Sequence, residues 1–147
     1  DEREHARATL VANLRRATRS APDMALLLEG LNPRDKPGYF YSTLREKAEI
    51  IAAVGAPNLK IMFDAYHVGV SEGDIFMKFA RYQPLVGHVQ IAAVPSRAEP
   101  DEGEIAYANF FRELDRLGYD GWIGCEYRPR GSTDEGLGWV KKLGVTL

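Results

Sequence analysis

The 147-residue sequence is short of the features that mark several classes of protein. Its one cysteine, Cys125, excludes an internal disulfide and a cysteine-rich zinc site, and is typical of a reducing compartment. The 19 basic and 21 acidic residues nearly balance, so no excess of positive charge points to nucleic acid. No uncharged apolar run approaches the roughly 18 residues of a membrane span. The composition therefore predicts a cytoplasmic globular domain without a nucleic-acid or membrane partner.

Two further absences concern the chain start and cofactor binding. The first residue is Asp1 rather than Met, and no signal peptide is visible, which favours a fragment of a longer protein. A glycine-rich dinucleotide fingerprint is also missing, because "GLGWVKKLG" lacks the G-x-G-x-x-G spacing. We therefore expect chemistry that needs no nicotinamide or flavin.

Apolar periodicity predicts an alternation of helices and strands. Thr43 and Glu46 have the spacing of a capping box, which starts a helix that ends at Gly55. The other expected helices are 1–20, 73–82, 107–117 and a last one around 137–143, and the expected strands are 24–30, 59–67, 87–94 and 121–129. Strands joined by crossover helices are parallel, with right-handed connections. The strands lack strict alternation, which predicts that both sheet faces are covered.

Chain length leaves two architectures open. An eight-unit parallel barrel needs about 250 residues, or roughly 31 for each βα unit. The four units here fit a small doubly wound sheet or the second half of a barrel. The absent initial Met favours the half-barrel.

Each expected strand carries one polar residue near its carboxyl end, and successive ones lie about one βα unit apart. These residues are Glu29, Asp64, Gln90 and Glu126. Carboxyl ends of parallel strands open on one edge, so the four side chains could converge. Three buried carboxylates would repel one another, and each is costly to bury unless a positive charge is paired with it. A divalent cation would supply that charge, and oxygen ligands favour Mg²⁺ or Mn²⁺. The alternative for each residue alone is a helix cap or an ion-pair partner.

Several neighbours of these strand ends are candidates for substrate contact. His67 could orient a substrate or shuttle a proton, and Arg97 could hold a substrate carboxylate, as could Arg128 and Arg130. The alternative is that these are ordinary core or solvated residues. Cys125 is expected to point to the opposite face and pack there.

Five segments together resemble the hydroxypyruvate isomerase family of the xylose-isomerase-like barrels, which also include ketose 3-epimerases and 2-oxo-tetronate isomerases. They are "LLLEGLN", "NLKIMFDAYH", "GHVQIA", "PSRAEPDEGEI" and "GWIGCEYRP". The resemblance implies a (β/α)8 TIM barrel with a divalent metal at its carboxyl face. Residues 1–147 would then form a single domain, the C-terminal half of that barrel. A second copy or an N-terminal half-barrel would be the partner that completes it.

The resemblance also implies roles for individual residues. Glu29, Asp64, Gln90 and Glu126 match the metal positions, Glu29 and Glu126 match the proton donor and acceptor, and His67 and Arg97 match positions near the substrate. The implied reaction is a metal-assisted isomerisation of hydroxypyruvate to tartronate semialdehyde through an ene-diolate. The alternatives are an epimerase or isomerase of a larger sugar or 2-oxo-tetronate, a metal-dependent phosphodiesterase or repair nuclease, and an inactive half-barrel fragment.

Overall fold

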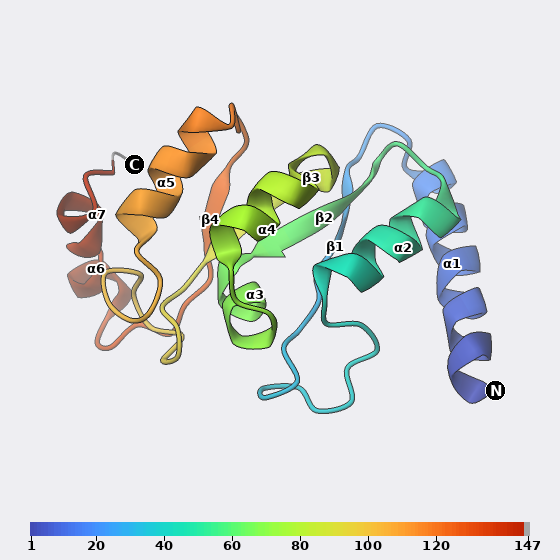
Figure 1. Cartoon of the computed structure of the whole chain (residues 1–147), viewed down its shortest axis with the longest axis horizontal. Coiled ribbons are helices and arrows are strands. Elements are labelled where there is room, and N and C mark those ends of the chain that lie inside the picture. The colour runs from blue at the N-terminus through green and yellow to red at the C-terminus, as the bar shows by residue number, and fades with distance from the viewer. Residues whose placement is uncertain (146–147) are drawn as a thin grey trace.

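The computed structural model describes residues 1–145 and shows an α/β fold with a parallel sheet (Figure 1). The strands are β1 (Leu26–Leu28), β2 (Leu59–Asp64), β3 (Val86–Ile91) and β4 (Ile123–Cys125). The helices are α1 (Glu2–Ser20), α2 (Leu44–Val54), α3 (Ala65–Ser71), α4 (Ile75–Tyr82), the 3₁₀ turn η1 (Gln83–Leu85), α5 (Tyr107–Arg116), α6 (Thr133–Gly136) and α7 (Trp139–Lys142). No helix within 1–145 has the length and apolar character that a membrane span requires.

The four strands lie side by side in chain order, β1-β2-β3-β4, and every neighbouring pair is parallel. A doubly wound sheet reverses its strand order at a switch point, and these strands show no such reversal. The strand order therefore favours a barrel-like winding over the doubly wound alternative. Register also matters for function, because Asp64 on β2 is paired with Gln90 on β3.

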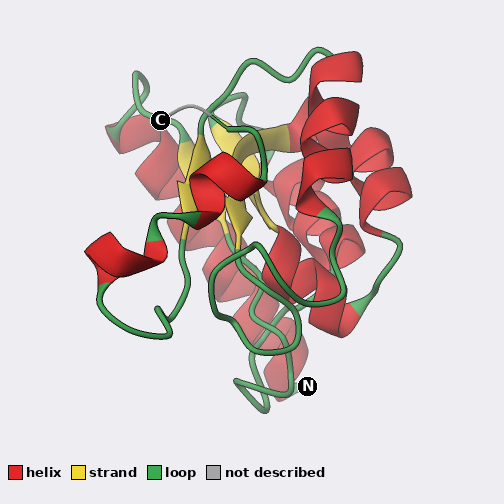
Figure 2. Cartoon of the chain, turned by 90° about the vertical axis from the view of Figure 1, so that its left-hand side faces the viewer, coloured by secondary structure: helices red, strands yellow, loops and turns green. Residues whose placement is uncertain are grey.

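One face of the sheet carries the core. Phe63 on β2 is fully buried and packs against Phe79 of α4 and Phe110 of α5, with ring centroids 5.2 and 6.2 Å away. Side chains that alternate with Phe63, such as Lys60 and Met62, are only partly buried. Within the described residues, the face that carries Lys60 and Met62 is therefore covered only in part, less than the sequence predicts. Figure 2 shows the strands running through the middle of the molecule between helices and loops.

The capping box expected before α2 is present. Glu46 donates its backbone N–H to Thr43 Oγ1 at 3.2 Å, and the Thr43 N–H donates to Glu46 Oε2 at 3.0 Å. Gly55 then ends the helix with a φ of 72°, in the left-handed region that glycine adopts without strain. Local sequence therefore determines both ends of this helix.

Several expected elements differ from the structure; the strands predicted over 24–30 and 87–94, for example, are Leu26–Leu28 and Val86–Ile91. The strand predicted over 59–67 ends at Asp64, because the Asp64 carboxylate starts helix α3 directly. The strand predicted over 121–129 is confined to Ile123–Cys125. The last helix, predicted around 137–143, is the shorter α7, and the separate turn α6 before it was not predicted. Cys125 is exposed rather than packed.

Candidate active site

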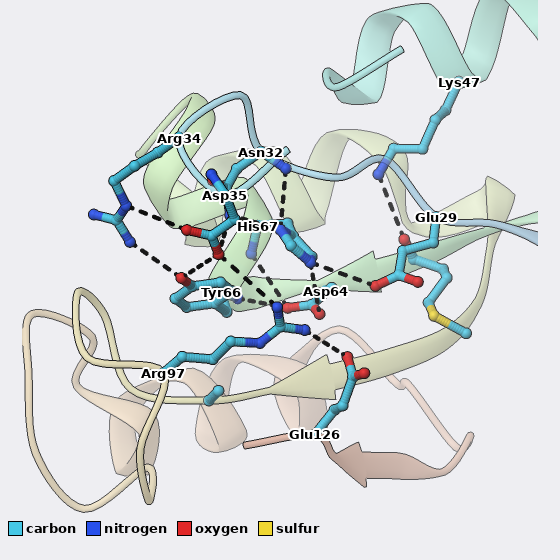
Figure 3. A network of polar contacts seen from close by, with 12 residues as sticks. Glu29, Asn32, Arg34, Asp35, Lys47, Asp64, Tyr66, His67, Arg97 and Glu126 are labelled. Atoms are coloured by element: carbon cyan, nitrogen blue, oxygen red, sulfur yellow. Dashed lines mark hydrogen bonds and ion pairs between the residues drawn. The ribbon is translucent and has the colours of Figure 1, made fainter. Parts of the chain in front are cut away.

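The carboxyl edge of the sheet brings polar side chains from separate strands into one region (Figure 3). Glu29 follows β1 by one residue, Asp64 is the last residue of β2, Gln90 lies near the end of β3, and Glu126 follows β4. This is the edge predicted from the parallel topology. The contacts of each side chain show which of the four lie close enough to act together.

Asp64 organises the turn from β2 into α3. Its Oδ1 accepts hydrogen bonds from the backbone N–H of Tyr66 at 2.8 Å and of His67 at 3.2 Å. The carboxylate therefore satisfies two donors that a helix start leaves free. Burial raises the pKa of Asp64 despite these bonds. The same capping places His67 over the sheet edge.

His67 is buried, with its two ring nitrogens in different surroundings. Nδ1 lies 3.1 Å from the backbone N of Asn32 and 2.7 Å from Asn32 Nδ2. Nε2 lies 3.6 Å from Glu29 Oε1 and 3.9 Å from Asp64 Oδ2, and makes no hydrogen bond within the described chain. Burial lowers the pKa of His67 to about 4, and Arg97 adds to that effect.

Glu29, Asp64 and His67 form a compact cluster. One potential ligand atom from each lies within 4.8 Å of the other two. Burial, followed by the charges of Asp64 and Glu126, raises the pKa of Glu29 to about 7. The pKa of Glu29 therefore lies near neutral pH, where a carboxyl group can both take up and release a proton.

Two buried oxygens at this edge have unmet bonding capacity. Glu29 Oε1 and Gln90 Oε1 are shielded from solvent and have no hydrogen-bond partner in residues 1–145. A buried acceptor without a partner costs about 1–3 kcal/mol. A hard divalent cation bonds to carboxylate and amide oxygens, so this donor set fits Mg²⁺ or Mn²⁺.

Glu126 is bound to Arg97 instead of entering the compact cluster. Its Oε2 lies 2.9 Å from an Arg97 terminal nitrogen, and its side chain is 53% exposed. The structure thus brings Glu29 and Asp64 together and sets Gln90 beside Asp64 in the sheet. Glu126 acts on Glu29 through its charge. The metal roles predicted for these four residues stay predictions.

Arg97 is held over the site from three sides. Its guanidinium lies over the Tyr66 ring at 4.9 Å, and one nitrogen is 3.9 Å from Asp35 Oδ2 in addition to the Glu126 contact. The backbone of Arg97 has a φ of 59°, which is uncommon for a residue with a side chain. Its carbonyl accepts from the Arg128 N–H at 2.7 Å, which helps to keep that conformation.

Arg130 does not fit the substrate role considered from sequence. It makes ion pairs with Glu99 at 3.0 Å, Asp101 at 2.6 Å and Glu102 at 2.7 Å. Glu99 is fully buried, so Arg130 supplies the charge that this carboxylate needs. Arg130 is thus a structural residue of the loop after β4.

Sequence reasoning missed several residues of the site. Asn32, Asp35 and Tyr66 form a hydrogen-bonded group, in which Tyr66 Oη donates to Asp35 Oδ2 at 2.6 Å. Lys47 of α2 is also buried, and its Nζ donates to the Met62 carbonyl at 3.5 Å. The "LNPRD" turn directly after Glu29 was the available signal for Asn32 and Asp35, because such turns often line sites at strand ends.

Comparisons with known proteins identify the family to which the chain is similar. The family model described as "Xylose isomerase-like TIM barrel" matches residues 1–143. The chain is 49% identical over 142 residues to a 2-oxo-tetronate isomerase of Cupriavidus necator, covering 95% of this chain and 55% of that protein. It is 40% identical over 139 residues to the hydroxypyruvate isomerase of Escherichia coli, covering 93% and 54%.

A solved structure is similar over the same extent. The crystal structure described as an AP endonuclease, family 2, from Brucella melitensis superposes with a TM-score of 0.92 at 40% identity. That match covers 95% of this chain and 55% of the other. The chain therefore spans about half the length of the relatives that it matches.

Proposed function

Since the chain belongs to the xylose isomerase-like TIM barrel family, we propose that it carries the metal-binding half of an aldose–ketose isomerase active site. The proposed substrate is a small hydroxy-oxo acid, and the proposed reaction is hydroxypyruvate to tartronate semialdehyde. The observation that carries the proposal is the position of Glu29, Asp64 and Gln90 at one sheet edge, with two buried oxygens that have no hydrogen-bond partner in residues 1–145. Relatives named as isomerases support the reaction class.

The metal would be held by the oxygens of the strand ends. Glu29, Asp64 and Gln90 are the first set, and Glu126 would join them by leaving Arg97. A bound divalent ion supplies Lewis-acid stabilisation of negative charge on oxygen, which is worth several kcal/mol. We propose Mg²⁺ or Mn²⁺ because every donor in this set is an oxygen.

The proton transfers fall to the two glutamates. The isomerisation removes a proton from C3 of hydroxypyruvate and returns one to C2, while a hydroxyl proton passes from O3 to O2. A positioned carboxylate contributes typically 10²–10⁴-fold to such a transfer. Glu29, with its pKa raised to about 7, suits one of these steps, and Glu126 suits the other. Metal coordination would lower the pKa of Glu29 again.

Arg97 suits the substrate carboxylate. Its guanidinium is partly exposed, with 18% of the side chain accessible, and faces Glu126 at the mouth of the site. A planar guanidinium can bind a carboxylate through two hydrogen bonds. Binding there would orient the acid end of the substrate away from the reacting carbons.

Substitution of the glutamates tests the reaction. Glu29→Gln and Glu126→Gln should each lower turnover of hydroxypyruvate at least about 100-fold, because each loses a general acid or base. Proton exchange at the substrate carbons in D₂O, followed by NMR, measures this loss. Glu49→Gln on the exposed face of α2 is the matched control and should keep the parent rate. Near-normal exchange in either site variant would refute the two-carboxylate mechanism.

A second candidate is isomerisation of 2-oxo-tetronate. It is favoured by the higher identity to the Cupriavidus necator protein, 49% against 40% for the Escherichia coli one. The two acids differ by one carbon, so a ratio of kcat/KM values on both substrates discriminates them. A higher kcat/KM for 2-oxo-tetronate than for hydroxypyruvate would assign the chain to 2-oxo-tetronate isomerisation instead.

We further propose that the domain is the C-terminal half of a barrel. Its end strands β1 and β4 each have one neighbour in the described sheet, and barrel closure requires a second. An N-terminal half-barrel or a second copy of the chain would supply it. Molar mass in solution, measured by light scattering, separates a dimer from a monomer.

A further inference from the structure

We propose that Asn32 is a positioning residue that fixes His67 as a neutral imidazole with its proton on Nε2. In this form His67 is a hydrogen-bond donor to oxygen and not a ligand of the metal. The part of this inference that concerns substrate rests on the proposed function. The part that concerns the proton position stands on the geometry of the loop after β1.

The backbone of Asn32 favours an unprotonated Nδ1. Its N–H points at His67 Nδ1 with an N···N distance of 3.1 Å. A backbone N–H can only donate, so in this geometry Nδ1 offers its lone pair and carries no proton. An imidazole with a bare Nδ1 is neutral and has its proton on Nε2.

The side chain of Asn32 places a second donor at Nδ1, which shares the single lone pair with the backbone N–H. Its Oδ1 accepts from the Asp35 backbone N–H at 2.9 Å, and its Nδ2 donates to Asp35 Oδ2 at 3.2 Å. These two contacts fix which end of the amide is nitrogen. The end that lies 2.7 Å from His67 Nδ1 is therefore the NH₂ donor.

The surrounding contacts hold this arrangement rigid. Asn32 is fully buried although it lies in a loop, and its carbonyl accepts from the Lys36 N–H at 3.0 Å. Asp35 accepts from the hydroxyl of Tyr66, which adjoins His67 on α3. The loop and the start of α3 are thus tied together through two independent contacts.

The consequence appears at the other ring nitrogen. Nε2 faces Glu29 Oε1 at 3.6 Å and Asp64 Oδ2 at 3.9 Å (Figure 3), and is buried without a hydrogen bond in the described residues. A protonated nitrogen has no lone pair for a metal ion. The N–H is therefore available to an oxygen atom of a bound substrate beside Glu29, and the metal ligands are restricted to oxygens.

Nitrogen NMR of the whole chain tests the proton position directly. The protein has three histidines, so spectra of ¹⁵N-histidine-labelled protein are assigned with His67→Gln, which removes one set of signals. The expected result near neutral pH is a protonated Nε2 and a bare Nδ1 for His67. A protonated Nδ1, alone or together with Nε2, would overturn the proposal.

Asn32→Asp tests the side chain that we hold responsible. A carboxylate at position 32 can only accept, so it competes for Nδ1 with the backbone N–H of residue 32, which the substitution leaves in place. The fraction of His67 with its proton on Nδ1 should therefore rise, and with it the fraction whose Nε2 lone pair faces Glu29 and Asp64. Zn²⁺ affinity relative to Mg²⁺ should then rise about tenfold, the scale of such ligand-orienting contacts. Asn13→Asp on exposed α1 adds the same charge and should change neither signal nor affinity.

The outcomes separate this inference from the proposed function. An unchanged His67 spectrum in Asn32→Asp would show that the side chain does not influence the tautomer, and would overturn the positioning role of the Asn32 side chain. That result would leave the activity test with Glu29→Gln and Glu126→Gln, and therefore the proposed function, unchanged. Conversely, a chain without isomerase activity but with Nε2 protonated would refute the function and leave the tautomer in place.

Discussion

Replacement of Lys47 by Met should stabilise the fold, and the gain should disappear at high pH. Lys47 is 1% exposed, and burial lowers its pKa to about 8, partly opposed by Glu72, Asp64 and Glu29. The unfolded chain has a lysine pKa near 10.4. Between these values the unfolded state binds more protons than the folded one, so stability rises with pH.

The size of the effect follows from the shift. One pKa unit is worth about 1.4 kcal/mol, so burying the charged lysine costs about 3 kcal/mol below pH 8. Lys47→Met removes that cost and forfeits the contact with the Met62 carbonyl, worth about 1 kcal/mol. The variant should therefore be about 2 kcal/mol more stable than the parent near pH 7.

Urea unfolding of parent and variant measures this difference. From about pH 7 to about pH 9.5 the parent should gain about 2 kcal/mol relative to the variant, because its lysine becomes neutral in the folded state. Lys36→Met in an exposed loop is the matched control and should show no such change. A constant difference between Lys47→Met and the parent across this pH range would refute the reasoning.

Three other substitutions have defined outcomes. Asp64→Ala should weaken Mn²⁺ binding in a calorimetric titration at least about tenfold, and an unchanged affinity would remove it from the metal set. Arg97→Lys should raise KM for a carboxylate substrate about tenfold, with a smaller change in kcat, because lysine lacks the planar guanidinium that stacks on Tyr66 and can bind a carboxylate through two hydrogen bonds. Gly87→Ala should destabilise the fold by about 1–3 kcal/mol in a denaturant titration, because its Cβ would lie 2.7 Å from Lys60 Cβ; an unchanged midpoint would contradict this.

The sequence predicted the local features well where a short segment carries its own signal. The capping box of Thr43 and Glu46 and the end of α2 at Gly55 are confirmed. The end of the strand at Asp64 was missed by three residues. Asp64 caps α3 directly after the strand, and the sequence gives no break between the apolar strand residues and the first residues of that helix.

The candidate site was predicted in part. Polar residues at strand ends identified the edge, since parallel topology places all carboxyl ends together. The pairing of Glu126 with Arg97 and the burial of Lys47 had no sequence signal, because they depend on side-chain directions in the folded chain. Arg130 was considered for substrate from its position alone and is held by Glu99 instead.

Sequence alone thus determined the alternation of elements, the parallel sheet and the edge where Glu29 and Asp64 meet, because periodicity and spacing are properties of the chain. Only the tertiary structure decided which nitrogen of His67 meets Asn32 and which meets the carboxylates. These contacts join residues more than 30 positions apart, and their chemistry depends on ångström distances and burial. Spacing along a chain can bring groups to one edge but cannot decide which atom carries the proton.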